Sequence, residues 1–302
     1  MDNLCHSMLG GALGKAGLAS RTPLGMTTLI VANNLPDVDV AVFATDTLAM
    51  SFRRGWTHGV LAQATLPIVL TAIIVACDRL FRRNAPERAK PIEILWLSYL
   101  GVVCHVFLDF LNSYGVRLLM PFSERWFYGD ALYIIDPIMY IALGAGWLLA
   151  TRHGVRPARI GLTVVAVYIA VMVASNLVAR RVVHAGLTRA GRPADTRFMV
   201  TPVFVNPFRR EVIVDVGRRY EKGFLWFEPW PHFRPAGYGV DKGFDLPEAE
   251  RLLELPRARA FLRWSRFPFV QIDPSPPDAG AWINDYRYSS AGPYGWSATK
   301  LQ

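Results

Sequence analysis

Two ionisable residues stand one helical turn apart inside a long apolar run. In the segment WLSYLGVVCHVFLDFLNSYG, His105 and Asp109 lie among aliphatic and aromatic residues. Residues four apart share one face of a helix, so both side chains can reach the same ion. An ionisable group in a membrane-like segment is costly unless it pairs or does chemistry. The pair is therefore a candidate for metal binding.

Other histidines and aspartates lie near the ends of neighbouring apolar segments. Asp37 belongs to NLPDVD, His58 belongs to RGWTHG, and His6 lies near the start of the chain. Two imidazoles and two carboxylates suit a borderline-soft divalent ion, Zn²⁺ first and Mn²⁺ or Fe²⁺ next. We expect Asp37, His58, His105 and Asp109 to be ligands of one or two ions, with His6 as the next candidate.

Further aspartates are candidates for supporting roles. Asp39 and Asp136 are candidate catalytic residues, either as a general base or as acceptors that orient an imidazole, and Asp130 is a further candidate ligand or acceptor. Each residue taken singly also has a structural interpretation. An Asp beside Pro often caps a helix, and a buried His is often only hydrogen-bonded. On that interpretation the whole set pins helices and holds no metal.

The apolar residues are concentrated in the first part of the chain. The protein has 302 residues, 52% of them hydrophobic, and a mean hydropathy of +0.23. A membrane helix needs roughly 20 apolar residues. About five or six segments of the first 180 residues fit: 4–19, 24–44, 59–77, 92–112, 131–150 and 160–179. The pattern predicts an α-helical multi-span membrane domain over residues 1–182, followed by a small α+β soluble domain over residues 183–302.

Basic loops predict the orientation of these segments. Loops 78–91 and 151–159 are rich in Arg and Lys, which places both on the cytoplasmic side. The candidate ligands and everything after residue 180 then fall on the outer side, and the ligands share one depth. Arg53 and Arg54 fit this topology poorly, because they lie in an outer loop. Most of the clustered Arg and Lys residues lie in such short loops, where topology explains them, so nucleic-acid binding is a poor interpretation.

The composition changes after residue 185, where long apolar runs stop. Residues 198–205, 211–216 and 219–228 are predicted strands, the third turning at Lys222–Gly223. Asp245 and Pro247 mark a helix start, and Pro256 is expected to break or restart that helix. Residues 269–273 and 282–288 are predicted closing strands. Aromatic side chains here are expected to pack in a core.

Several motifs together resemble a bacterial family. These are MDNLCHSMLGGALGKA, NLPDVD, RGWTHG, HVFLDFLNSYGVRLLMPFSERWFYGDALYIIDP and, near the end, RFPFV and DYRY. They are similar to the inner-membrane metal-dependent hydrolases of the YdjM/YbcI type, over most of the chain and in the same order. The resemblance implies a multi-pass protein of the bacterial inner membrane with a hydrolase site.

A more distant likeness concerns the ligands. The order His, Asp, His and then HxxxD is similar to part of the ligand set of zinc-dependent phospholipases C and related nucleases. This likeness implies that Asp37, His58, His105 and Asp109 hold one ion, and that His6 with a shared Asp109 helps to hold another. The later HxxxE-type ligands of that group are missing from this sequence, which favours one or two ions over three.

Two functional hypotheses follow. The first is a membrane-embedded hydrolase that acts by metal-activated water on a lipid or lipid-linked ester or phosphoester, because the ligands lie near the outer interface. The second is a non-enzymatic metal-binding membrane scaffold, transporter or sensor. A transporter needs a polar path, whereas the polar residues here gather at one depth. Membrane lipids are the expected partners in either case.

Overall fold

The computed structural model describes residues 1–44, 49–247, 249–273, 280–288 and 298–301. It contains two compact units. The first comprises residues 1–44 and 52–174, and the second comprises residues 45–51 and 175–302. The division falls inside one long helix, α7 (Arg156–Arg189), which contributes its first part to one unit and its second part to the other.

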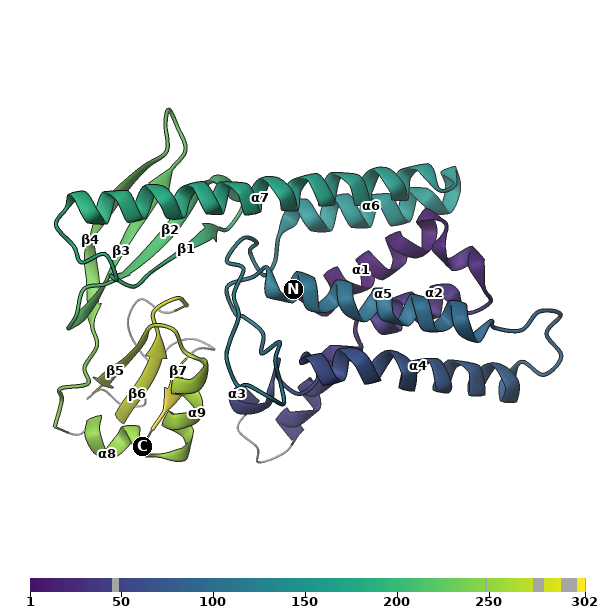
Figure 1. The fold of residues 1–302 in the computed structure, drawn as a ribbon, viewed down its shortest axis with the longest axis horizontal. Helices are drawn as coiled ribbons and strands as arrows, with labels where there is room; N and C mark the ends of the chain where they lie inside the picture. Colours follow the sequence, from purple (N-terminus) through teal and green to yellow (C-terminus); the bar gives the residue numbers. More distant parts are fainter. Residues whose placement is uncertain (45–48, 248, 274–279, 289–297, 302) are drawn as a thin grey trace. The chain divides into compact units, whose positions relative to one another are not determined.

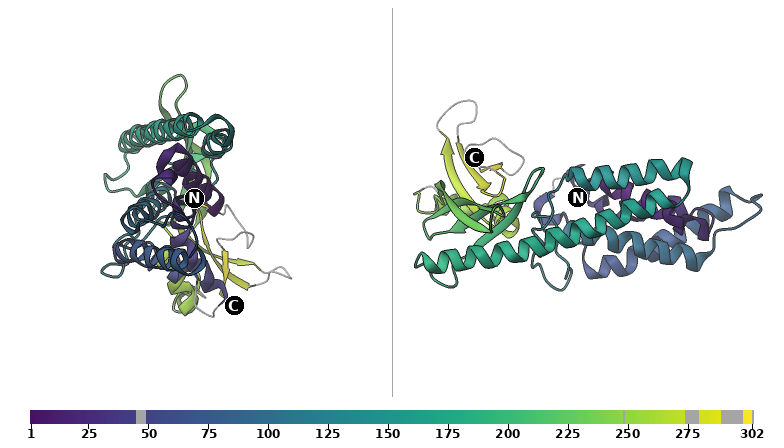
Figure 2. Two further views of the ribbon diagram at one scale, coloured as in Figure 1. Left: turned by 90° about the vertical axis from the view of Figure 1, so that its right-hand side faces the viewer. Right: turned by 90° about the horizontal axis from the view of Figure 1, so that it is seen from above.

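Among the described residues, three helices are long and apolar enough to cross a membrane. These are α4 (Val60–Phe81), α5 (Pro91–Phe110) and α7. Pro91 occupies the first turn of α5, where its missing N–H costs nothing. Asp78 at the end of α4 accepts a hydrogen bond from the backbone N–H of Ala89 and fixes the short turn into α5. The helices α4 and α5 lie side by side as an antiparallel pair (Figures 1 and 2).

The other three predicted membrane segments form shorter helices, because local sequence interrupts them. The first segment forms α1 (Asn3–Leu13) and a π-helical stretch whose Gly17 has φ 119°. The second breaks at Asn33–Asn34 into α2 (Gly25–Ala32) and the 3₁₀ helix Leu35–Ala44. The fifth begins as a helix only at Asp136–Pro137, giving α6 (Pro137–His153), whose 17 residues span roughly 26 Å against a core of about 30 Å.

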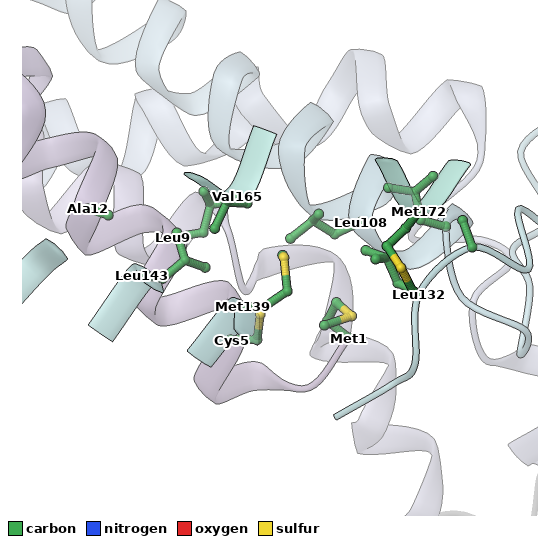
Figure 3. Close-up of a cluster of buried hydrophobic side chains, with 12 residues drawn as sticks. Met1, Cys5, Leu9, Ala12, Leu108, Leu132, Met139, Leu143, Val165 and Met172 are labelled. Carbon is green, nitrogen blue, oxygen red and sulfur yellow. The ribbon is translucent and has the colours of Figure 1, made fainter. Parts of the chain in front are cut away.

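The core of the first unit lies between α1, α5, α6 and α7. Figure 3 shows Cys5, Leu9 and Ala12 of α1 facing Leu108 of α5, Met139 and Leu143 of α6, and Val165 and Met172 of α7. These side chains are at most 7% exposed. The packing sets α1 against the end of α5, so it brings His6 and His105 toward each other.

Small residues let the helices of this unit approach closely. A Cβ added to Gly101 of α5 would stand 2.4 Å from the Cβ of Ala32 at the end of α2. A Cβ added to Gly10 of α1 would stand 2.8 Å from the carbonyl oxygen of Leu29. Contacts this short require glycine, and they fix α2 between α1 and α5.

The second unit contains two antiparallel sheets. The first has the order β1 (Phe198–Val203), β2 (Asn206–Asp215), β3 (Arg219–Trp226) and β4 (His232–Asp241). The second has the order β5 (Pro268–Asp273), β6 (Gly280–Asp285) and β7 (Ala298–Lys300). This unit also contains the short helices α8 (Ala249–Leu253) and α9 (Pro256–Trp264), while α3 (Ala49–Phe52) spans a boundary between the units in the sequence. The predicted fold class, helical membrane region followed by an α+β region, is confirmed.

Strand alternation gives the first sheet two apolar faces. Val200, Val212 and Val214 pack on Ala179 and Val183 of α7. Their neighbours Met199, Ile213 and Tyr220 pack on Phe267, Phe269 and Tyr286 beside the second sheet. The period of two along each strand therefore builds the two cores of this unit, and the sheet lies against α7 in Figures 1 and 2.

Most predicted strands are confirmed, with two corrections. The predicted turn at Lys222–Gly223 is wrong, because both residues lie inside β3 and pair across the sheet, Lys222 with Ile213 and Gly223 with both Val212 and Pro235. Strands β4 and β7 were not predicted, and in β4 Pro235, Gly237 and Gly239 break the strand pattern. The restart of a helix at Pro256 is confirmed by α9.

Candidate metal centre

The four predicted ligands converge from separate elements of the first unit. Asp37 comes from the 3₁₀ helix Leu35–Ala44, His58 from the turn before α4, and His105 and Asp109 from the last turns of α5. One ligand atom from each lies within 4.8 Å of the others. All four residues are at most 4% exposed. The i, i+4 spacing on α5 thus places two candidate ligands side by side, as the sequence predicts.

The separations of the ligand atoms fit one small divalent ion. His58 Nε2 lies 3.1 Å from His105 Nε2, 3.4 Å from Asp109 Oδ2 and 3.9 Å from Asp37 Oδ1. His105 Nε2 lies 3.8 Å from both Asp37 Oδ1 and Asp109 Oδ2. Ligands about 2.0–2.2 Å from a tetrahedral ion are separated from one another by roughly 3.3–3.6 Å. The observed distances between ligand atoms, 3.1 to 3.9 Å, bracket this value. Asp37 Oδ1 accepts no hydrogen bond from the described residues.

Neighbouring polar groups orient the two imidazoles. His105 Nδ1 lies 2.6 Å from the carbonyl oxygen of Asn33 and donates a hydrogen bond to it, which leaves Nε2 free to bind an ion. His58 Nδ1 lies 3.0 Å from Thr57 Oγ1, and that hydroxyl donates to Asp39 Oδ2 at 3.1 Å. Both histidines therefore turn the same nitrogen, Nε2, toward the centre of the cluster.

Asp39 occupies the position of an orienting acceptor. It is buried and also accepts a hydrogen bond from the backbone N–H of Arg54 at 2.7 Å. Its Oδ2 lies 3.7 Å from His58 Nδ1, the nitrogen that faces away from the other ligands. This is the imidazole-orienting alternative of the two roles predicted for Asp39.

Asp136 lies at the N-terminus of α6. Its Oδ1 accepts hydrogen bonds from the backbone N–H groups of Ile138 and Met139, and its Oδ2 accepts one from the Tyr168 hydroxyl at 2.7 Å. Both oxygens are thus engaged in capping α6 and tying it to α7. A catalytic role for Asp136 remains a prediction. Asp130 is fully buried in the loop before α6.

His6 lies beside the four-residue group. Its ring stacks on that of His105 with centroids 3.9 Å apart, and its Nε2 lies 3.4 Å from Asp109 Oδ1. The ring is fully buried, and neither of its nitrogens forms a hydrogen bond with the described residues. Buried imidazole nitrogens are normally hydrogen-bonded. His6 is therefore available as a fifth ligand of the ion or as a ligand of a second one.

Arg54 is a component of the site that the sequence prediction missed. Its Nη2 lies 3.0 Å from Asp109 Oδ2, its Nη1 donates to Asn112 Oδ1 at 3.2 Å, and the guanidinium stacks on Tyr114. The amino group of Met1 contacts the other oxygen of Asp109. Only 5% of Arg54 is exposed. The sequence did contain a signal for Arg54, because an arginine in an outer loop does not fit the positive-inside rule. Such an arginine calls for another explanation, for example an acidic partner.

Comparisons with known proteins support a membrane location. A model of a family described as "YdjM inner membrane protein" matches residues 1–181. The chain is 29% identical over 154 residues to the uncharacterized protein YfhP of Bacillus subtilis (strain 168), an alignment that covers 47% of this chain and 44% of that relative. The chain thus spans less than half the length of that relative. No solved structure matches the chain.

Proposed function

Because the chain belongs to the YdjM inner membrane protein family, we propose that it is a membrane-embedded, metal-dependent hydrolase. One observation carries the proposal. Four buried ligand atoms, from Asp37, His58, His105 and Asp109, converge within 4.8 Å of one another. Zn²⁺ is the favoured ion for two imidazoles and two carboxylates, with Mn²⁺ or Fe²⁺ as alternatives.

The side chains of the site have two roles in this proposal, binding the ion and orienting its ligands. Asp37, His58, His105 and Asp109 hold the ion, while the Asn33 carbonyl and Asp39, through Thr57, keep the imidazoles aimed at it. A bound divalent ion supplies an acidified water and polarises the oxygen of the bond to be cleaved. A general-base role for Asp39 or Asp136 stays a prediction.

The charge of the site favours an anionic substrate. Arg54 is a permanent cation 3.0 Å from a ligand oxygen, and its planar fork suits phosphate. The apolar helices around the cluster favour a substrate with a lipid portion. We therefore propose a lipid-linked phosphoester or ester as the substrate class.

The orientation in the membrane follows from charge. Residues 82–90 between α4 and α5 and residues 152–159 before α7 are both basic. The positive-inside rule places both in the cytoplasm. Because α5 leads outward from residues 82–90, this topology requires α6 to cross back, and its 17 residues reach the lower limit for a spanning helix. The site and the second unit are then on the outer side of the bacterial inner membrane.

Hydrolysis can be tested with the full chain in detergent. The protein is stripped with a chelator, resupplied with Zn²⁺ or Mn²⁺, and assayed against lipid-linked phosphoesters and esters. We expect release of product only with the ion, and its loss in His58→Ala but not in His153→Ala, whose residue is exposed at the end of α6. Metal-loaded wild-type protein that cleaves no substrate contradicts the proposal.

Burial favours a second candidate, a closed metal centre that stabilises a scaffold, transporter or sensor. His58, His105 and Asp109 are completely buried, and structural zinc sites are closed to solvent. This candidate predicts that removing the ion lowers the melting temperature while no substrate is turned over at any ion concentration. The same assay distinguishes the two.

A further inference from the structure

An exposed apolar turn joins β1 and β2 in the second unit. Val203 pairs with Asn206, so the turn consists of Phe204 and Val205. Phe204 is 51% exposed, Val205 63% and Phe208 59%. Three large apolar side chains therefore project from one hairpin tip, where water is the usual neighbour and polar residues are the norm.

The backbone of this turn makes the choice of residues unusual. Val205 has φ 60°, in the left-handed region. Short hairpin turns normally place Gly or Asn at a position with positive φ, because a β-branched side chain is strained there. A strained, exposed valine gains nothing from the core of its own unit, so its benefit must come from something that the tip contacts.

The packing of the hairpin on α7 indicates what that contact is. The Asn176 side chain donates to the carbonyl oxygen of Val200, and the Arg210 side chain contacts Ser175. His184, two turns later on the helix, lies against Phe198 instead. β1 thus runs back along α7 from the level of His184 toward Ser175.

Ser175 is where this unit meets the membrane-spanning part of its own helix. Residues 160–179 of α7 carry no charge, and Arg180 follows them. Phe204 follows Val200 and comes directly after the end of β1, so the turn lies on the Ser175 side of the sheet. The tip therefore lies on the side of the sheet where the charge-free residues 175–179 of α7 belong to this unit.

The turn between β3 and β4 also exposes a large apolar side chain at this end of the sheet. In the antiparallel order β1-β2-β3-β4, the β3–β4 turn lies at the end that carries the β1–β2 turn. It contains Trp230, which is 77% exposed. Tryptophan is enriched at membrane–water interfaces. Nearby, Arg209 stacks on the rings of Phe224 and Trp226.

We propose that the β1–β2 turn, Phe204 and Val205 with Phe208, is a lipid-surface anchor that inserts into the interfacial region of the bilayer. With α7, it gives the second unit two attachments to the membrane. An inserted tip buries its apolar side chains in the interface, as amphipathic anchors do. The partner is the lipid surface itself.

Spin labelling of the full chain in nanodiscs of phosphatidylethanolamine and phosphatidylglycerol tests the proposal. In a Cys77→Ala/Cys104→Ala background, a nitroxide is attached at Val205→Cys, at Phe208→Cys and, as a control, at Asp241→Cys. Asp241 is exposed and closes the opposite end of the same sheet. Two tip positions keep the test valid if one variant fails to fold.

We expect labels at positions 205 and 208 to collide more with oxygen than with a water-soluble nickel chelate, and the label at position 241 to show the reverse preference. Equal nickel accessibility at all three positions overturns the proposal. Spin–spin broadening at position 205 with no oxygen preference also overturns it, because it assigns the tip to a second copy of the chain.

Discussion

Single residues decide how the imidazoles of the site are held. His105 uses the Asn33 carbonyl and His58 uses Thr57 and Asp39, so a chain of hydrogen bonds leads from each ring into the backbone or a carboxylate. Partners of this kind raise the basicity of a ligand and fix its tautomer. The site depends on them as well as on the four ligands.

Loss of the Thr57 hydroxyl tests this dependence. Thr57→Val keeps the shape of the side chain but removes the link between His58 and Asp39. We expect metal affinity to fall by about 10–100-fold with the fold intact, measured by competition with a fluorescent chelator. Thr65→Val on α4 is the matched control, because Thr65 is exposed and its hydroxyl bonds only to the Leu61 carbonyl. Equal affinity in the two variants would rule out an orienting role.

In the second unit, one buried ion pair predicts a pH dependence. Asp285 is fully buried, and Arg287 contacts both of its oxygens at 2.9 Å. Burial alone would raise the pKa of Asp285, but the Arg287 guanidinium and hydrogen bonds from Arg287 and Ser265 hold that pKa below its usual range. The stabilisation is therefore complete above the unfolded pKa of about 4 and is lost as the pH falls through the lower folded value.

Asp285→Asn tests this ion pair. Removing one partner of a buried pair costs about 3–5 kcal/mol, since the Arg287 charge is left uncompensated. Near neutral pH, hydrogen exchange of the β6 amides should show a free energy of local opening that is lower in the variant than in wild type by that amount. As the pH is lowered, the variant should lose less protection than wild type does. Protection in the variant that equals wild type at neutral pH would contradict the account.

The grouping of the four candidate ligands could be predicted because ionisable groups are conspicuous in apolar sequence, and because the i, i+4 spacing fixes His105 and Asp109 on one face. Arg54 and the Asn33 carbonyl were not predictable in the same way. Arg54 reaches Asp109 across 55 residues of chain, and a backbone carbonyl carries no side-chain signature. Such contacts depend on tertiary packing.

At the scale of elements, close contact between helices places the orienting carbonyl. Gly101 of α5 packs against Ala32. A Cβ added to Gly101 would stand 3.2 Å from the backbone nitrogen of Asn33. Asn33 in turn supplies the carbonyl that holds His105. The spacing between α2 and α5 is therefore coupled to the metal site.

Gly101→Ala tests that coupling. The new Cβ would stand 2.4 Å from the Ala32 Cβ, so α2 and α5 must separate. We expect a loss of about 1–3 kcal/mol in stability and weaker metal binding, because overpacking displaces the backbone. Gly144→Ala on α6 is the control, since its Cβ would meet only Met8 at 3.5 Å. Identical melting temperatures and metal affinities in the two variants would show that the spacing between α2 and α5 is not coupled to the metal site.

Helix existence was predicted better than helix length. The apolar runs at 59–77, 92–112 and 160–179 became α4, α5 and α7, because nothing in them breaks a helix. The run at 24–44 contains Asn33, Asn34 and Pro36, whose side chains and ring compete with helical hydrogen bonds. Hydropathy averages over such residues, so it predicts one long segment where the backbone forms two short ones.

At the scale of the whole molecule, the basic loops predict the topology. Glu87 lies in the loop between α4 and α5, and Asp241 lies in the second unit. In intact cells with the Cys77→Ala/Cys104→Ala background, an impermeant maleimide should label Asp241→Cys, and should label Glu87→Cys only after permeabilisation. The reverse pattern would place the second unit in the cytoplasm.

The most direct test of the central claim is metal content per chain. Elemental analysis of detergent-purified wild type, Asp37→Ala, His105→Ala and His153→Ala should show about one or two ions in wild type. The account predicts the same content in His153→Ala and loss of metal in the two ligand variants. Folded wild-type protein that contains no metal after resupply would contradict it, and the histidines and aspartates would then be residues that pack and cap helices.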